Sequence, residues 1–86
     1  MSDQVKVYAL STCIHCRNTK EFLKKCGVEY DCVDVDTLTG EERDRIVEEV
    51  RRLNPELTFP TVVIGDRIIV GFKEKELREA LGLDED

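Results

Sequence analysis

Several features that would assign this sequence to a broad class are missing from it. No apolar run approaches the roughly 20 residues that a membrane-crossing helix needs. The first residues, Met1-Ser2-Asp3-Gln4, lack the basic and apolar regions of a secretory signal. Internal repeats and low-complexity tracts are also missing, and only 2 residues are proline. These absences argue against a membrane-spanning, exported or repetitive protein, and we expect a folded protein of the cytoplasm.

Positive charge is in short supply. Lys and Arg together number 13 against 19 Asp and Glu, which gives a formal net charge of −6 at pH 7. Binding to nucleic acid requires a basic surface that neutralises phosphates. We therefore expect no nucleic-acid partner. The acidic ending Asp84-Glu85-Asp86 is interpreted as a solvated tail.

Cysteine, in contrast, is well represented, with 4 in a chain of 86 residues. Small secreted domains use such cysteines as a disulfide framework because their cores are poor. Here 41% of the residues are apolar, which is enough to build a core, and we expect one domain over residues 1–86. In a reducing compartment, a cysteine pair then indicates metal binding or redox chemistry.

The periodicity of apolar residues predicts the element order βαβαββα. We expect strands at residues 5–10, 30–36, 61–64 and 67–70, the last two joined by a tight turn at Gly65-Asp66. We expect helices at about residues 13–26, 39–53 and 73–81. The first two strands should pair in parallel across the intervening helix. The predicted fold is α/β, with a four-stranded mixed sheet flanked by three helices.

Local signals refine the helix boundaries and faces. The spacing of Thr39 and Glu42 is that of a capping box, and Gly27 and Gly82 stand where left-handed C-terminal caps are wanted. In the first helix, small or apolar residues recur at helical spacing and are predicted to face the core: Ile14, Thr19, Phe22, Leu23 and Cys26.

Cys13 and Cys16 form a Cys-x-x-Cys motif between a strand and a helix. The first turn of a helix has unpaired N–H groups and a partial positive charge, which favour a thiolate on Cys13. Arg17 and Lys20 would add positive potential. His15 could stabilise the thiolate when protonated, but a solvated side chain is the interpretation we favour. Cys16 is near enough in sequence to attack a mixed disulfide held on Cys13.

A metal site is the alternative use of these thiols. Zinc and iron–sulfur clusters generally require four ligands, usually with a second closely spaced pair. Cys26 and Cys32 are too widely spaced for that pattern and fall at a helix end and inside a strand. We predict that both occupy half-buried positions and that no metal is bound.

A second motif lies about 45 residues further on, where Pro60 stands immediately before a predicted strand. With Thr58-Phe59-Pro60 the chain resembles the glutaredoxin family of the thioredoxin fold over nearly its whole length. The resemblance rests also on residues 8–16 and on Ile69-Val70-Gly71-Phe72.

The resemblance implies a thiol-disulfide oxidoreductase that needs no cofactor and acts as a monomer on protein or small-molecule disulfides. Cys13 would be the nucleophile and Cys16 the resolving thiol. In the family the proline is cis and stands beside the cysteines, and the residue before it pairs with an extended substrate. The implied substrate-binding residues are Thr58, Phe59, Pro60, Gly71 and Phe72, and those supporting the cysteines are Thr12, Ile14, His15, Arg17 and Lys20.

Departures from the family pattern bear on the electron donor. Glutathione-dependent members typically have Pro-Tyr between the cysteines, a lysine three residues before the first cysteine, and Gly-Gly followed by an aspartate. Here the corresponding residues are Ile14-His15, Leu10, Val70-Gly71 and Lys73. Gly71-Phe72-Lys73 instead looks like the NrdH-redoxins, which are served by thioredoxin reductase and reduce ribonucleotide reductase, although Val70 departs from them. We therefore favour a general dithiol reductase over a strict glutathione enzyme, and the electron donor is expected to be either a flavoprotein of the thioredoxin reductase type or glutathione.

Two further hypotheses stay open at this stage. The chain could be an iron–sulfur module in which two copies share a cluster through Cys13 and an external thiol, since some glutaredoxins do so and Ile14 replaces the usual proline. It could also be a non-catalytic interaction domain that uses the groove beside Pro60 only for binding.

Overall fold

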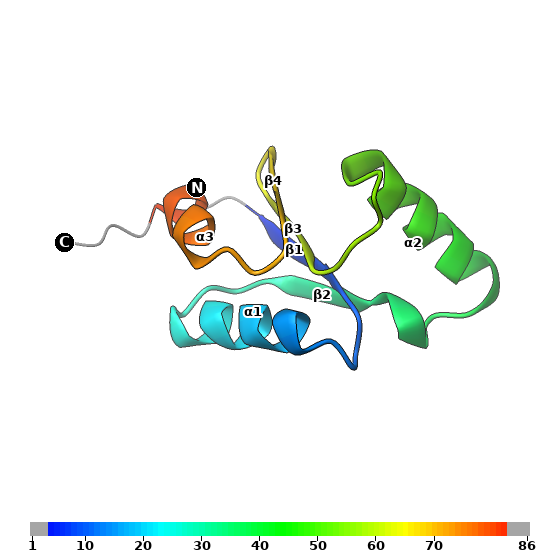
Figure 1. Cartoon of the computed structure of the whole chain (residues 1–86), viewed down its shortest axis with the longest axis horizontal. Coiled ribbons are helices and arrows are strands. Elements are labelled where there is room, and N and C mark those ends of the chain that lie inside the picture. Colours follow the sequence, from blue (N-terminus) through cyan, green and yellow to red (C-terminus); the bar gives the residue numbers. More distant parts are fainter. Residues whose placement is uncertain (1–3, 83–86) are drawn as a thin grey trace.

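The computed structural model describes residues 4–82 and has the predicted element order (Figure 1). Its elements are β1 (Val5–Ala9), α1 (Ile14–Lys25), β2 (Asp31–Asp34), the 3-10 turn η1 (Val35–Thr37), α2 (Gly40–Leu53), β3 (Thr61–Ile64), β4 (Arg67–Val70) and α3 (Glu74–Leu81). Within this part of the chain, the helices are too short or too polar to cross a membrane.

The sheet is mixed, with strand order β2-β1-β3-β4. Strand β1 pairs in parallel with β2 and antiparallel with β3, and β3 forms the predicted hairpin with β4. Tyr8 of β1 stands opposite Thr61, the first residue of β3. This arrangement of four strands and three helices confirms the predicted thioredoxin-like α/β fold.

Alternation along β1 divides the core between the two faces of the sheet, because successive side chains of a strand point to opposite sides. On one face, Val5, Val7 and Ala9 pack with α1 and α3. On the other face, Tyr8 packs with Val35 and with Val50 of α2. The Tyr8 hydroxyl also donates a hydrogen bond to Glu49, which ties α2 to the sheet.

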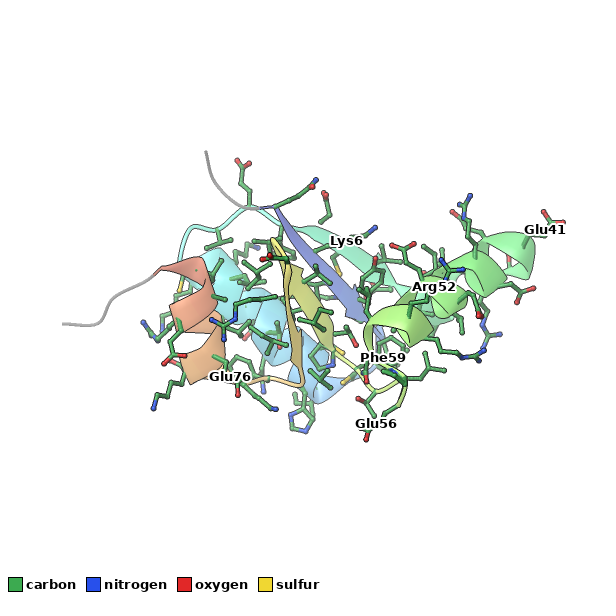
Figure 2. The ribbon with its side chains drawn as sticks, turned by 90° about the horizontal axis from the view of Figure 1, so that it is seen from above. Lys6, Glu41, Arg52, Glu56, Phe59 and Glu76 are labelled. Carbon is green, nitrogen blue, oxygen red and sulfur yellow. The ribbon has the colours of Figure 1, made fainter. Side chains whose placement is uncertain are left out.

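Only the second half of α2 takes part in this packing. Residues 40–45 are all exposed, and Figure 2 shows this end of the helix, with Glu41 near its tip, extending beyond the sheet. The apolar residues of this helix that pack against the sheet begin at Ile46, and Val50 is fully buried in the core.

The second strand differs from its prediction. It ends at Asp34 instead of residue 36, because Val35 turns into η1 and is buried against Tyr8 and Val50. Cys32 is exposed and not half-buried as predicted, since β2 is an edge strand of the sheet. Cys26 is partly buried, as predicted.

Two predictions about helix starts were wrong. Ile14 is 58% exposed, because it begins α1 on the side away from the sheet, and Cys16 is buried in its place. Thr39 occupies the N-cap of α2, but its side chain makes no capping hydrogen bond. The predicted C-terminal glycines are confirmed, since Gly27 and Gly82 both have φ near 74°.

The packing of α1 predicts very different effects for two apolar truncations. Leu23→Ala should lower the free energy of unfolding by about 2–5 kcal/mol, because Leu23 is fully buried against the sheet. Ile14→Ala should change it by less than about 0.5 kcal/mol, because Ile14 is exposed. Denaturant unfolding of both variants measures the difference, and equal losses would contradict this packing.

Candidate active site

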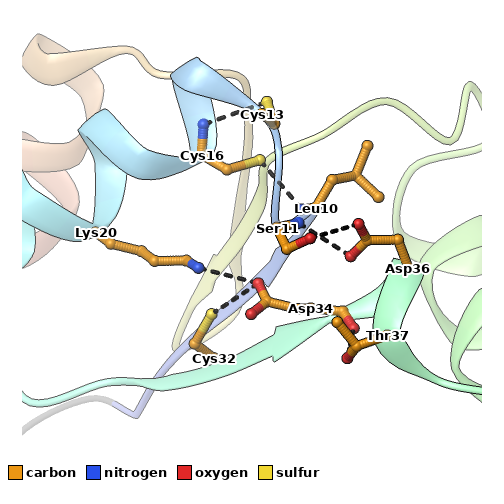
Figure 3. A network of polar contacts seen from close by, with 9 residues as sticks. All are labelled: Leu10, Ser11, Cys13, Cys16, Lys20, Cys32, Asp34, Asp36 and Thr37. Atoms are coloured by element: carbon orange, nitrogen blue, oxygen red, sulfur yellow. Dashed lines mark hydrogen bonds and ion pairs between the residues drawn. The ribbon is translucent and has the colours of Figure 1, made fainter.

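Cys13 lies at the junction of β1 and α1, in a short turn that is closed by a backbone hydrogen bond. Its N–H donates to the Leu10 carbonyl at 3.2 Å, and it serves as the N-cap of α1 with extended φ and ψ of −89° and 124°. Its Sγ accepts a hydrogen bond from the Cys16 N–H at 3.3 Å (Figure 3). The sulfur therefore takes the place of the side-chain oxygen that usually caps a helix. It accepts a hydrogen bond from an N–H group that has no partner within the helix.

This environment lowers the pKa of the Cys13 thiol. Partial burial acts in the opposite direction, but hydrogen bonds from the Cys16 side chain and from the N–H groups of Cys16 and His15 outweigh it. Cys13 is thus partly accessible and stabilised as a thiolate, which is the reactive form of a cysteine.

Cys16 has the opposite character. It is fully buried in the core cluster beneath α1, and its Sγ accepts a hydrogen bond from the Leu10 N–H at 3.4 Å. Burial raises the pKa of the Cys16 thiol to about 12, and the neighbouring Cys13 adds to the effect. The two sulfurs are therefore a partly accessible one that is stabilised as a thiolate and a buried thiol, one turn apart.

A carboxylate that sequence reasoning missed fixes the turn before Cys13. Asp36 of η1 accepts hydrogen bonds from the Ser11 N–H at 3.0 Å and the Ser11 hydroxyl at 2.7 Å (Figure 3). These bonds lower the pKa of Asp36. No local sequence signal marks this contact, because Ser11 and Asp36 are brought together only by the pairing of β1 with β2.

The two cations predicted to act on Cys13 are engaged elsewhere. Arg17 is exposed and lies 3.9 Å from Glu21, one turn further along α1. Lys20 Nζ lies 2.9 Å from Asp34 at the end of β2, and this contact raises the pKa of Lys20. The charge of Lys20 acts on Cys16, whose thiolate it favours.

The segment before β3 lies next to the end of β1 that leads to the cysteine pair. The Phe59–Pro60 peptide is cis, as the family resemblance implies, and Pro60 is buried. Because Tyr8 stands opposite Thr61, the antiparallel register brings Pro60 alongside the end of β1 that leads to Cys13. Figure 2 shows Phe59 on the loop between α2 and β3, and its ring packs against both core clusters.

Asn54 organises this loop and was also missed. It is buried, and its side-chain amide donates to the Thr58 carbonyl at 3.1 Å and to the Thr58 and Thr61 hydroxyls at 3.0 and 3.3 Å. Its side-chain oxygen accepts from the Glu56 N–H. Sequence analysis did not identify Asn54, since a buried amide network cannot be recognised from composition.

The remaining predicted residues divide into two groups. Gly71 lies beside Pro60, and its N–H donates to the Pro60 carbonyl at 2.8 Å. The ring of the neighbouring Phe72 packs edge-to-face against that of Phe22, with 6.0 Å between the ring centroids. Thr12, Ile14, His15 and Arg17 are all exposed around the start of α1. His15 lies in the first helical turn and not in a loop.

The thiols are distributed over three places. Cys13 and Cys16 are together, whereas Cys26 caps the far end of α1 and Cys32 lies on β2. Between residues 4 and 82, the structure contains no group of three or more His, Cys, Asp or Glu side chains that could hold a metal ion.

Comparisons with known proteins identify the family of this chain. The glutaredoxin family model matches residues 5–69. A glutaredoxin-like 8.6 kDa protein from the rubredoxin operon of Clostridium pasteurianum is 36% identical over 73 residues, covering 85% of this chain and 91% of that protein.

Solved structures extend the comparison. The glutaredoxin from Methanosarcina mazei is 54% identical, with a TM-score of 0.86 over 93% of this chain and 79% of that one. The NrdH-redoxin of Escherichia coli superposes with a TM-score of 0.75 over 96% of this chain and 97% of that one, and at 20% identity it shares the fold. The family match and these similarities show that the chain is a member of the glutaredoxin family of thiol-disulfide oxidoreductases.

Proposed function

We propose that this protein reduces disulfides through a dithiol mechanism in which Cys13 is the nucleophile and Cys16 resolves the intermediate. One observation carries the proposal: the Cys13 sulfur accepts the N–H of Cys16 at the start of α1 while the Cys16 thiol is buried directly behind it. An accessible thiolate attacks and a protected thiol follows, which is the division of labour that disulfide exchange requires.

The reaction proceeds in two exchanges. The Cys13 thiolate attacks one sulfur of the substrate disulfide, and the other sulfur departs as a thiolate and takes up a proton. Cys16 then attacks the Cys13 sulfur of the mixed disulfide, releasing the second substrate sulfur and leaving a Cys13–Cys16 disulfide. Two electrons pass to the substrate, and an external donor must return them.

The surface beside Cys13 supplies the proposed substrate groove. Phe59 and Phe72 are partly exposed and would give it an apolar wall, whereas Pro60 is buried, and the hydrogen bond between Gly71 and Pro60 holds the two segments together. Thr58 extends the groove, with its carbonyl tied to Asn54. Such a wall suits an extended protein segment on either side of a disulfide.

The donor proposed is a flavoprotein of the thioredoxin reductase type, with glutathione as the alternative. Leu10 stands where glutathione-dependent members have a lysine, and it carries no charge that could pair with a carboxylate. Lys73 is exposed near the position of their aspartate and has the opposite charge. Disulfide-containing proteins, with ribonucleotide reductase as one candidate, are the proposed substrates of a cytoplasmic monomer.

Replacing each cysteine separately should divide the mechanism into its two steps. Cys13→Ser should abolish disulfide reduction, because Cys16 is buried and protonated. Cys16→Ser should accumulate a mixed disulfide on Cys13, visible as a mass increase in intact-protein mass spectrometry. Cys26→Ser serves as the control and should keep wild-type activity. Full activity of Cys13→Ser would refute the assignment.

The capping geometry predicts how alkylation of Cys13 depends on pH. Because its pKa is lowered, the thiolate persists at pH values below the ordinary midpoint of about 8.5 for a free cysteine. The rate of carbamidomethylation of Cys13, followed by peptide mass spectrometry, should therefore rise at lower pH than for an unfolded peptide. Cys16→Ala should move the midpoint upward by removing one hydrogen bond. Identical midpoints for protein and peptide would contradict this.

The electron donor can be tested by a coupled assay with insulin as the disulfide substrate. Reduction should be faster with NADPH and thioredoxin reductase than with glutathione and glutathione reductase. Leu10→Lys combined with Lys73→Asp should raise the glutathione-dependent rate, because the pair restores charges typical of glutathione-dependent relatives. A wild-type protein served only by glutathione would reverse the donor assignment without affecting the cysteine roles.

A further inference from the structure

The resolving step contains an electrostatic difficulty that the two cysteines do not remove by themselves. Cys16 must become a thiolate to attack, yet it is fully buried, and burial disfavours the charged form. Its sulfur accepts one backbone hydrogen bond, from Leu10. A neighbouring cation would stabilise negative charge on Cys16 further.

Lys20 is positioned to supply that charge. It follows Cys16 by four residues on α1, so the two side chains lie on the same face of the helix. Its Nζ is held 2.9 Å from Asp34 Oδ1, and the two side chains are only 27% and 32% exposed. Figure 3 shows the ammonium between α1 and β2, below the cysteine pair.

Asp34 holds the Lys20 ammonium near the turn that contains the two cysteines. It pairs with Ala9 across the parallel ladder, and Leu10, the next residue, donates its N–H to Cys16. The ion pair and the buried sulfur are therefore both attached to the junction of α1, β1 and β2, at neighbouring positions of β1. Arg17 has no equivalent anchor, since it is exposed beside Glu21.

On the basis of the proposed dithiol function, we propose that Lys20, anchored by Asp34, is a positioning residue that stabilises the Cys16 thiolate during resolution. The same charge assists the later reduction of the Cys13–Cys16 disulfide. When an external thiol attacks the accessible Cys13 sulfur of the internal disulfide, Cys16 departs as a thiolate, and a stabilised thiolate leaves faster.

The charges that face Cys16 and Lys20 favour this role at the moment it is needed. The Cys13 thiolate opposes ionisation of Cys16, whereas Lys20 favours it. Once Cys13 is bound in a mixed disulfide, its negative charge is gone and Lys20 acts without that opposition. The ammonium also faces Asp34 and the Cys32 thiol, which donates to the Asp34 carboxylate at 3.8 Å and whose thiolate Lys20 favours as well.

The step balances without a further reactant. The Cys16 thiol gives up its proton, its sulfur bonds to Cys13 Sγ, and the bond between Cys13 and the substrate sulfur breaks. The departing sulfur takes the electron pair of that bond and is protonated. Lys20 keeps its own proton throughout and contributes only charge.

Stopped-flow reaction with dithiobis-nitrobenzoate resolves the two exchanges, since each releases one coloured thiolate. The first phase reports attack by Cys13 and the second reports resolution by Cys16. Cys26→Ser and Cys32→Ser are made together as the background, so that the remaining thiols do not contribute. Cys16→Ser in that background should lose the second phase.

In that background, Lys20→Met should slow the second phase by about three- to tenfold and leave the first within about twofold, because the Coulomb effect is partly screened and only partly expressed in the rate. Lys20→Arg keeps the charge and should restore most of the rate. Lys24→Met is the matched control, an exposed lysine in the last turn of α1, and should change neither phase.

Two results would overturn the inference. One is a second phase of unchanged rate in Lys20→Met, and the other is an equal slowing of both phases, which would indicate a general structural effect. Failure of the proposed function has a different signature, because the background protein would then lack the rapid first phase or the second phase altogether.

Discussion

The contact between the Cys13 sulfur and the backbone N–H of Cys16 is the interaction on which the site depends. It uses a general property of helices, that their first N–H groups lack partners within the helix, to hold a negative charge without a metal or an arginine. The same geometry buries Cys16, because a residue three positions into α1 turns toward the sheet while the N-cap residue remains at the surface.

Several contacts remote in sequence keep this helix start in position. Asp34, the last residue of β2, contacts Lys20 of α1, and Asp36 of η1 contacts Ser11 in the turn before α1. On the opposite side, Asn54 holds the loop that presents Pro60. Polar contacts from two separate parts of the chain therefore hold the segments around the site. The apolar core fixes the helices and strands that these segments connect.

Much of the fold could be predicted because apolar periodicity reports directly on which residues are buried. The alternation in β1, the apolar residues of α2 from Ile46 to Leu53 and the Gly65-Asp66 turn each carry a strong local signal. Predictions failed where a local pattern competed with tertiary packing. Ile14 matched the helical period but begins the helix on its exposed side, and Val35 left its strand because Tyr8 and Val50 provide it with a buried site.

The sequence by itself determined the spacing of the two cysteines, their place between a strand and a helix, and the proline that marks the family, since each of these is a local property of the chain. Only the tertiary structure decided which charge acts on which sulfur. Lys20 is four residues from Cys16 and seven from Cys13, and the strand pairing that brings Asp34 to it directs its charge toward the buried thiol. Electrostatic effects depend on distance and burial in space, and these follow from packing between segments that are far apart in the sequence.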